Sequence, residues 1–480
     1  MEGLEVVEIL KSKTINITNE ERWDSEYYKK VFLENEKKVH KIDTIKLKDL
    51  SVYIKKGIFD LPPSNYQNSG IPLIRTSEIK NPTIDFTTTV FISNKVNIEN
   101  ENTILYPNDL VFTKIGAYIG DVALLPSDYS QYNFSQNVVG VKLKYSENDG
   151  PYILAFFLSN LGRNQIMRSI MLSGQGKLEL KDIRNYEVPI ASNNFKLKIK
   201  ELFKIKEKCV NRSAEKYQQA ETLLLKTLGL EDFQPSTDPI NVKSFQESFL
   251  STGRLDAEYY QKKYEEIESK IKMYDYTTVE TEFDVLHGKY FQYIDEGEIG
   301  VIKTKQVTRG SGLNFDVDDF TSVDVLKSEN LHLIQNNDIV FASMGKGSLG
   351  KASLFYDFQT DKKFTIDSTL KIFRLKPNSK IKPEVIFVWI NSPLCYELIL
   401  RDEIGSTGIT SIYTQSINNL LLPMLDNQVQ NQISSLIHEN FRLKKQSEQL
   451  LETAKRAVEI AIEKDESAAL QFIESGNKFN

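Results

Sequence analysis

The sequence predicts a fold built twice in tandem, with strand-like and helix-like segments in each copy and a long helix at the end of each. The first observation is a repeated motif, Arg-x-Asp-x-Glu-Tyr-Tyr, which occurs in "ERWDSEYY" from Glu21 and in "GRLDAEYY" from Gly253. The motif recurs after 232 residues in a chain of 480. Further matching segments follow both copies in the same order, and such ordered self-similarity indicates a tandem duplication.

The segments after the motif match in pattern and spacing. "YPNDLVFTKIGAYIGDVALL" from Tyr106 corresponds to "QNNDIVFASMGKGSLGKASL" from Gln335. A helix-like apolar segment comes next, and a polar Gly loop then leads to an apolar stretch that ends at Pro189 or Pro423. The sequences between these shared segments differ almost completely. A duplicated frame with divergent inserts suggests two modules that do the same job on different targets.

Two long stretches predict two long helices, at residues 194–229, where Gly229 is a plausible stop, and at residues 426–464. Residues recurring every seven positions favour coiled-coil packing. These positions are Phe203, Val210, Tyr217 and Leu224 in the first helix, and Val429, Leu436, Leu443, Leu450 and Ala457 in the second, with Ile433, Asn440, Ser447, Ala454 and Ala461 interleaved. The matching length and place of the helices argue that they pair, with Asn440 able to fix the register. Two separate amphipathic surface helices are the alternative.

These patterns divide the chain into four regions. Between the halves, Pro235 and Pro239 enclose Ser, Thr and Asp in a stretch typical of a linker or surface turn. The regions are an N-terminal lead-in and first module at residues 1–190, a central helix at 191–230, a linker, lead-in and second module at 231–424, and a C-terminal helix at 425–480.

The composition, 40% hydrophobic and 26% charged, is that of a soluble globular protein. We expect no membrane span, because the apolar runs are too short, and no secretory signal at the N-terminus. The only cysteines, Cys209 and Cys395, lie in different halves, which suits the reducing cytoplasm. The net charge of -6 neither indicates nor excludes nucleic acid, because a local basic face is enough to contact phosphates.

Motifs for catalysis are weak in this sequence. "GKGSLG" from Gly345 has the Gly-x-Gly-x-x-Gly spacing of a nucleotide loop, but strand-like residues follow it where a phosphate-binding loop needs a helix. The other copy, "GAYIGD" from Gly116, keeps only the outer glycines, so a strand–turn–strand hairpin explains both. The four histidines are scattered, and we expect no metal, no cofactor and no catalytic residue in this chain.

Taken together, the ordered and duplicated motifs resemble the specificity subunit of type I restriction-modification systems, from about Glu21 to Lys464. The resemblance implies an α+β fold class, with two pseudo-repeated target recognition domains separated by two long helices that form an antiparallel coiled coil. Each domain would read one half of a bipartite double-stranded DNA site, and the helices would set the spacer.

The resemblance also implies partners. Two methyltransferase (modification) subunits would dock on the helical regions and methylate adenine with S-adenosylmethionine. Restriction subunits that use ATP and Mg would add translocation and cleavage. In this bacterial phage-defence scheme the present chain catalyses nothing.

Base reading needs hydrogen-bonding side chains on loops, with Arg suited to guanine and Asn or Gln to adenine. The candidate DNA-binding residues are Arg75, Thr76, Lys114, Tyr118, Gln136, Asn137, Ser173, Gln175 and Lys177 in the first module, and Lys303, Lys305, Lys346, Lys351, Ser406, Thr407 and Thr410 in the second. The Asp-x-Glu-Tyr-Tyr segment is interpreted as part of the frame, because phosphates would repel its acids.

Two other classes of protein stay open at this point. One is a self-contained DNA methyltransferase or endonuclease, or the specificity module of a related bipartite restriction system. The other is a coiled-coil scaffold that binds no nucleic acid.

Overall fold

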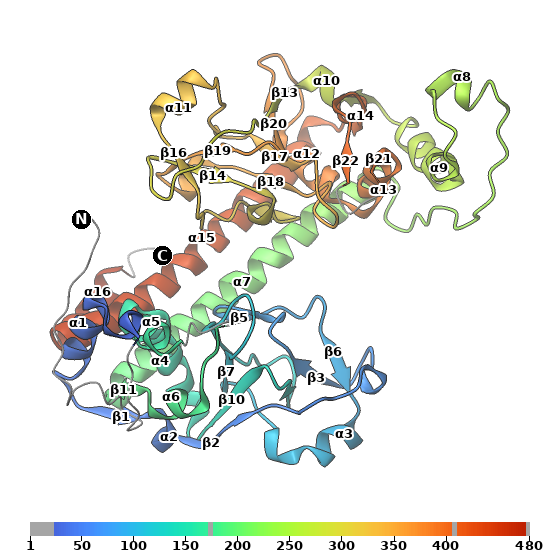
Figure 1. Cartoon of the computed structure of the whole chain (residues 1–480). Helices are drawn as coiled ribbons and strands as arrows, with labels where there is room; N and C mark the ends of the chain where they lie inside the picture. The colour runs from blue at the N-terminus through green and yellow to red at the C-terminus, as the bar shows by residue number, and fades with distance from the viewer. Residues whose placement is uncertain (1–23, 171–175, 406–409, 477–480) are drawn as a thin grey trace. The chain divides into compact units, whose positions relative to one another are not determined.

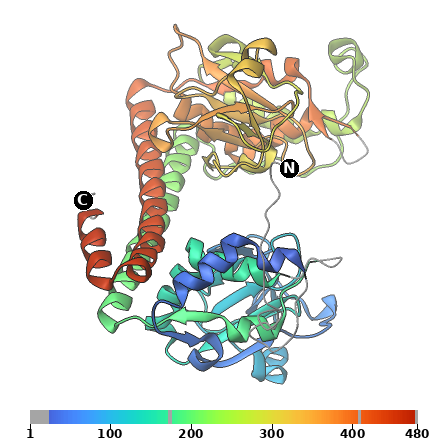
Figure 2. The same cartoon turned by 60° about the vertical axis from the view of Figure 1, so that its left-hand side comes forward.

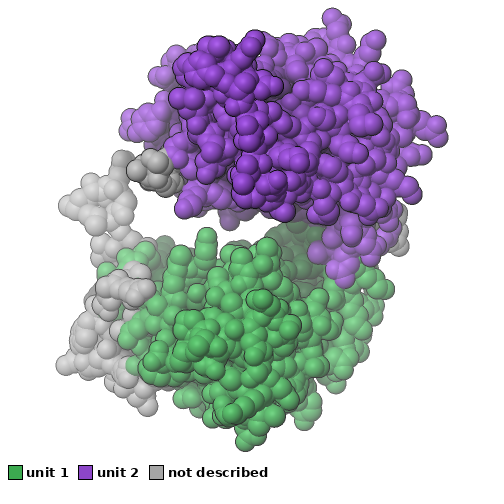
Figure 3. Space-filling model, turned by 90° about the vertical axis from the view of Figure 1, so that its right-hand side faces the viewer, with its two compact units in different colours: residues 1–208, 447–480 green, residues 209–446 purple. Residues whose placement is uncertain are grey.

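The computed structural model describes residues 24–170, 176–405 and 410–476 and separates the chain into two compact units (Figure 3). Unit 1 contains residues 1–208 and 447–480, and unit 2 contains residues 209–446. Each unit combines helices with strands, as the sequence predicts. Two long helices, α7 (Asn193–Thr227) and α15 (Asn427–Glu463), contribute one part to each unit.

Unit 1 is built on an antiparallel four-stranded sheet with the order β2-β10-β7-β8 (Figure 1). Its strands are β2 (Ser51–Lys56), β7 (Leu110–Thr113), β8 (Val122–Leu124) and β10 (Val138–Leu143). Residues 138–141 of β10 are all buried, since apolar layers cover both sides of the sheet. One layer contains helices α4 (Ser146–Leu158), α5 (Asn160–Ser169) and α6 (Leu180–Asn185).

The other layer of unit 1 is a three-stranded sheet with the order β6-β3-β9. Its strands are β3 (Ile71–Ile74), β6 (Val90–Ile92) and β9 (Asn133–Phe134). The remaining described elements are η2 (Ser25–Tyr28), α1 (Lys30–Val39), β1 (Thr44–Lys46), α2 (Leu47–Leu50), η3 (Pro63–Asn65), β4 (Ile79–Lys80), β5 (Thr83–Ile84), α3 (Asn94–Glu99), η4 (Glu101–Thr103), β11 (Glu187–Pro189) and α16 (Glu466–Gly476).

Unit 2 has a five-stranded sheet with the order β13-β20-β17-β18-β15, which is the strand arrangement of unit 1 with one strand added. The strands are β13 (Phe283–His287), β15 (Ser311–Gly312), β17 (Ile339–Ala342), β18 (Ala352–Leu354) and β20 (Leu370–Leu375). A three-stranded sheet, β16-β14-β19, covers one face. Its strands are β14 (Ile299–Ile302), β16 (Phe320–Thr321) and β19 (Lys363–Ile366).

Helices α12 (Pro383–Asn391) and α13 (Pro393–Arg401) cover the other face of the large sheet in unit 2. The remaining described elements are α8 (Phe249–Thr252), η5 (Ala257–Tyr260), α9 (Lys262–Ile271), β12 (Tyr276–Thr278), α10 (Val279–Glu282), η6 (Thr304–Gln306), α11 (Val323–Ser328), η7 (Asp357–Gln359), β21 (Glu403–Ile404), β22 (Ser411–Ile412), α14 (Thr414–Asn418) and β23 (Leu421–Pro423). Among the described helices none alone is long and apolar enough to cross a membrane, and α12 with α13 passes that test only as a pair bent by 72°.

The long helices begin and end within two residues of their predicted bounds, which confirms both predictions. The predicted buried stripe of α7 is wrong at Val210, which is 43% exposed, whereas Cys209 and Ser213 are buried. A strict seven-residue spacing drifts relative to the 3.6-residue turn of a straight helix, so the predicted stripe leaves the buried face. In α15 the interleaved positions Ile433 and Asn440 are buried, as predicted.

Helices α7 and α15 lie side by side (Figure 2), and within each unit residues of both helices belong to the same hydrophobic core. In unit 1 the shared residues are Phe195, Ile199 and Leu202 of α7 and Ala454, Val458 and Ile462 of α15. In unit 2 they are Ala220, Leu224 and Leu228 of α7 and Ile433, Ile437 and Phe441 of α15. The long helices are therefore part of the hydrophobic core of each unit.

Candidate nucleic-acid interface

Each unit gathers several loops at one end of its large sheet. In unit 1 these are residues 74–80, 113–121, 135–138 and 176–179, which we name loop cluster 1. Lys114 links three of them, because its N–H donates to Asn137 O at 2.9 Å and its carbonyl accepts from Leu178 N at 3.0 Å. Ser135 N donates to Ile74 O at 2.9 Å and attaches the fourth loop. Loop side chains in this cluster therefore stand on a hydrogen-bonded backbone frame.

Unit 2 has the corresponding loop cluster 2, which contains residues 302–306, 342–351, 367–370 and 410–413. Ser343 N donates to Thr369 O at 3.0 Å, and Ser343 O accepts from Ile412 N at 3.1 Å. Asp367 N donates to Ile302 O at 3.0 Å. The same three backbone bonds therefore hold loops of different sequence in the two units.

The glycine motif in loop cluster 2 is a hairpin turn, which confirms the prediction. Strands β17 and β18 flank it and pair antiparallel, so no helix follows the glycines. Gly345, Gly347 and Gly350 have φ angles of 105°, 75° and 80°, which side chains other than glycine rarely adopt. In unit 1, β7 and β8 form the same hairpin. The glycines of this motif therefore let the chain reverse direction between β17 and β18.

Arg75 of loop cluster 1 is engaged by a buried acid. Its Nε and one terminal nitrogen donate to Glu78 at 3.2 and 2.7 Å, and the same terminal nitrogen donates to Thr88 O at 2.8 Å. The side chain of Glu78 is 0% exposed. Its hydrogen bond raises the pKa of Arg75. The guanidinium therefore shapes the loop, and only its exposed edge faces solvent.

Other predicted residues of loop cluster 1 reach solvent. Tyr118 is 60% exposed, and the ammonium group of Lys80 lies 5.6 Å from its ring centroid. Asn137 is exposed and Gln136 is half-buried in the turn before β10. Thr76 lies beside the turn, with its Oγ1 3.8 Å from the place that a Cβ on Gly116 would take. The structure thus brings these predicted residues to one end of the unit.

Two predicted lysines of loop cluster 1 have contrasting surroundings. Lys114 is 7% exposed, and burial lowers its pKa, with further lowering by Lys56 and Lys177. Lys177 forms an ion pair of 2.7 Å with Glu179. The predicted Ser173 and Gln175 lie outside the described residues.

The predicted lysines of unit 2 divide into paired and exposed ones. Lys303 forms an ion pair of 2.6 Å with Asp319, and Lys305 forms one with Asp318. Lys346 is exposed at the tip of the hairpin, and Lys351 is half-buried where the hairpin returns to the sheet. The carbonyl of Thr410 accepts from Gly345 N at 2.8 Å, which fixes the hairpin. The predicted Ser406 and Thr407 lie outside the described residues.

The repeated Asn-Asp motif opens the strand that leads into each hairpin. Asn108 and Asn337 adopt left-handed φ angles of 65° and 70°. Asp109 accepts from Tyr106 N at 2.8 Å and from Leu143 N at 2.9 Å. Asp338 accepts from Gln335 N at 2.7 Å and from Arg374 at 2.6 Å. The motif recurs because it fixes a backbone turn.

The Tyr-Tyr motif also belongs to the frame. In unit 1 the guanidinium of Arg168 lies 4.2 Å from the ring of Tyr27 and forms an ion pair of 3.2 Å with Glu36. In unit 2 Arg401 lies 5.2 Å from the ring of Tyr259 and forms an ion pair with Glu268. These contacts attach the motif to α5 in unit 1 and to α13 in unit 2, and they support the structural interpretation of the motif.

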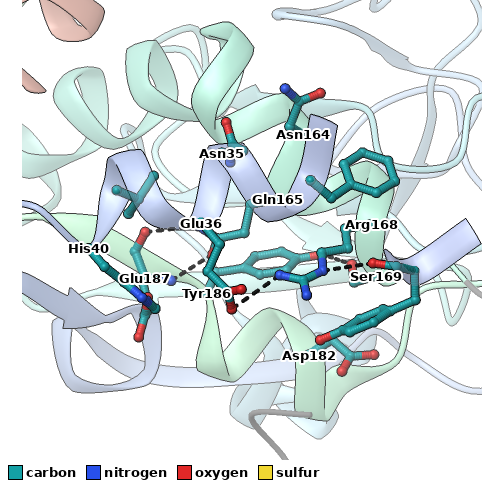
Figure 4. Close-up of a pocket in the computed structure, with 13 residues that line it drawn as sticks. Asn35, Glu36, His40, Asn164, Gln165, Arg168, Ser169, Asp182, Tyr186 and Glu187 are labelled. Atoms are coloured by element: carbon teal, nitrogen blue, oxygen red, sulfur yellow. Dashed lines mark hydrogen bonds and ion pairs between the residues drawn. The ribbon is translucent and has the colours of Figure 1, made fainter. Parts of the chain in front are cut away.

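A small pocket of about 60 Å³ lies beside this motif in unit 1 (Figure 4). Ser169 and Tyr186 share a hydrogen bond of 2.5 Å at its edge, and burial raises the pKa of Tyr186. Gln165 accepts from Glu187 N at 2.7 Å. Polar groups that line the pocket bond to one another, so these contacts join α5 to β11.

The acids that hold the predicted cations, and Lys56, are not among the residues predicted from the sequence. Glu78 follows Arg75 by three residues, and that spacing signals a local ion pair within one turn. Gly57 follows Lys56, and a Cβ on Gly57 would lie 2.0 Å from Phe134 O, so the backbones approach closely there. Because Phe134 is distant in the chain, the local sequence around Lys56 does not reveal this packing. Among the residues that the structure describes, no three His, Cys, Asp or Glu side chains gather as a metal site.

Comparison with known proteins gives one family match, at residues 39–222, to the type I restriction modification DNA specificity domain. No curated protein matches the chain. A crystal structure of the type I restriction-modification system S subunit from M. genitalium has 14% identity and a TM-score of 0.39, covering 88% of this chain and 96% of that one.

Two further solved structures show lower scores. The HsdS subunit from Thermoanaerobacter tengcongensis has 11% identity and a TM-score of 0.28, covering 88% of this chain and 97% of that one. A chain from work on complex assembly and conformational transition of the type I R-M system has 9% identity and a TM-score of 0.27, covering 90% of this chain and 97% of that one. The family match thus identifies a type I restriction modification DNA specificity domain at residues 39–222 of this chain.

Proposed function

We propose that the two units are pseudo-repeated target recognition domains, each of which reads one half of a bipartite double-stranded DNA site. One observation carries this proposal: equivalent backbone bonds hold loop clusters 1 and 2, while their side chains differ. A conserved frame with different polar side chains suits two half-sites of different sequence, because base edges are distinguished by the hydrogen-bonding groups that meet them.

The exposed and half-buried polar groups of the clusters are suited to this task. Loop cluster 1 offers Tyr118, Gln136 and Asn137, whereas loop cluster 2 offers Lys346 and Lys351. Amide side chains can bond adenine with two hydrogen bonds, and lysine can donate to the acceptors of guanine. Paired cations such as Arg75 and Lys303 would hold the loops in the reading position.

We also propose that α7 and α15 form an antiparallel coiled coil that sets the spacer between the half-sites. Support comes from the order of shared core residues. Leu202 of α7 shares a core with Ala454 of α15, whereas Ser213, further along α7, bonds Asn440, which lies earlier in α15. Partner numbers that fall along α15 as they rise along α7 support opposite directions for the two helices.

The proposal assigns no catalytic step to this chain. Two methyltransferase subunits would dock on the helical regions and methylate adenine with S-adenosylmethionine, and restriction subunits could add ATP- and Mg-dependent cleavage. The complex would act in the cytoplasm, where the DNA lies. The chain's own contribution is the choice of sequence.

A module swap tests the proposal. Residues 43–190 are replaced by the corresponding module of another specificity subunit, the chain is expressed with its neighbouring methyltransferase, and modified adenines are mapped by sequencing. We expect one half of the recognised site to change and the other half to stay. The reciprocal swap in unit 2 is the matched control and should change the opposite half. A change in both halves after a single swap, or no methylation pattern that depends on the chain, would contradict the proposal.

A further inference from the structure

Three lysines meet at one edge of unit 1. Lys56 ends β2 and pairs with Val139, which also pairs with Phe112. Cross-strand partners share a face of a sheet, and Lys114 follows Phe112 by two residues, so the side chains of Lys56 and Lys114 share that face. Lys177 reaches the same edge, because it forms a β-bridge with Ile115.

The charge at this edge is only partly balanced. Glu179 forms an ion pair of 2.7 Å with Lys177. The charge of Glu179 also raises the pKa of Lys114, against the lowering by burial and by the neighbouring lysines. Within the described part of the chain, no hydrogen-bond or ion-pair acceptor meets the Nζ atom of Lys56 or Lys114. Lys114 is nevertheless 7% exposed. A lysine with so little exposed surface and no partner for its charge is unfavourable, and an anion at this edge would supply that partner.

Unit 2 has different chemistry at the equivalent positions. His287 stands where unit 1 has Lys56, Ser343 where it has Lys114, and Ser411 where it has Lys177. Ser343 already donates to Thr369 O at 3.0 Å. The nearby Lys371 lies 2.9 Å from Nδ1 of His287 and has its partner there. This edge of unit 2 thus lacks the surplus of unpaired ammonium groups found in unit 1, as far as the described residues go.

We propose that Lys56, Lys114 and Lys177 bind one phosphate of the DNA backbone, and that unit 2 makes no equivalent contact. This inference rests on the proposed DNA-reading function and adds a division of labour to it. Phosphate contacts position a protein on the duplex without reading sequence, and lysines donate to phosphate as point charges. Unit 1 would therefore supply more of the salt-dependent binding than unit 2.

Salt-dependent binding tests the site. The full chain, assembled with its methyltransferase, is titrated against a labelled 40-base-pair duplex of random sequence at several KCl concentrations. We expect Lys56→Gln/Lys177→Gln to lower the slope of log K against log salt by about 1 and to weaken binding about 5- to 10-fold at 100 mM KCl. Glu179→Gln should strengthen binding about 2- to 5-fold, because it removes a competing acid. Lys37→Gln, an exposed lysine of α1, is the matched control and should change neither quantity.

Lys114→Met separates a phosphate ligand from a structural lysine. Removing an unpaired buried charge should raise the melting temperature of the free protein by about 2–4 °C, while it weakens binding to the duplex. A lower melting temperature with unchanged affinity would overturn the assignment. Inorganic phosphate at 10 mM, used as a second probe, should leave the melting temperature unchanged, and a rise that requires Lys56 and Lys177 would assign the site to a free anion instead.

The outcomes distinguish this inference from the proposed function. If the lysine variants bind with the wild-type slope and affinity, the phosphate site is wrong while DNA recognition stands. If the wild-type complex fails to bind duplex even at 50 mM KCl, the proposed function itself fails.

Discussion

Asn440 of α15 and Ser213 of α7 exchange three hydrogen bonds inside the core of unit 2. The side-chain Nδ2 of Asn440 donates to Ser213 O at 2.7 Å and to Ser213 Oγ at 2.9 Å, and Ser213 Oγ donates to the backbone O of Asn440 at 3.0 Å. Both residues are buried. This pair fixes which turn of one helix faces which turn of the other, because any slip would leave buried polar groups without partners.

Replacing Asn440 with alanine should therefore destabilise unit 2. We expect Asn440→Ala to lower the free energy of unfolding by about 1–3 kcal/mol, because the buried O and Oγ of Ser213 lose the donor that the Asn440 side chain supplies. Urea unfolding followed by circular dichroism measures the change. Asn431→Ala, at an exposed position of the same helix, is the matched control. Equal stability of the two variants would show that the pair does not fix the helices.

Arg75 should affect folding as well as DNA binding. We expect Arg75→Gln to lower the free energy of unfolding by about 3 kcal/mol, because it leaves the buried Glu78 without its charge partner. The double variant Arg75→Gln/Glu78→Gln should recover part of that loss. Lys95→Gln on α3 is the control. If Arg75→Gln keeps wild-type stability and only loses DNA affinity, Arg75 acts on DNA and not on the loop.

Stability should depend on pH through Asp109. Burial raises its pKa to about 6 from an ordinary value of 3.8. As the pH falls from about 7 to 4, the folded state takes up a proton at Asp109 before the unfolded state does, so this residue adds stability on acidification. The gain is of the order of 1–3 kcal/mol.

The Asp109→Asn variant isolates this effect, since an amide does not titrate. We expect the stability of the wild type relative to the variant to rise between pH 7.5 and pH 4.5 in urea unfolding. Asp60→Asn, at an exposed aspartate, should show no such trend. A difference between wild type and Asp109→Asn that is the same at both pH values would rule out the titration of Asp109.

Lengthening both long helices should change the spacer of the DNA site. Four residues inserted after Lys208 in α7 and after Gln446 in α15 add about 6 Å, close to two base pairs, at 1.5 Å per residue. We expect the modified adenines to move apart while both half-sites keep their sequences. Substituting the flanking residues without insertion is the control. An unchanged spacer would show that something other than the helices sets it.

The two long helices and the hairpins could be predicted because their signals are local. Uninterrupted helical composition determined α7 and α15 to within two residues, and the glycines between strand-like segments marked the turns. The predicted placement of Val210 failed, because which side of a helix is buried depends on the curvature and partners that the rest of the chain provides.

The candidate site shows the same division. The sequence alone determined which segments are duplicated and which polar residues stand in their loops, because chain order preserves that record. Only the tertiary structure decided that Arg75 is held by Glu78, and that Lys56, Lys114 and Lys177 share one edge while their counterparts in unit 2 do not. The charge state and availability of a side chain depend on neighbours distant in sequence, and folding alone brings those neighbours within range of hydrogen bonds and Coulomb forces.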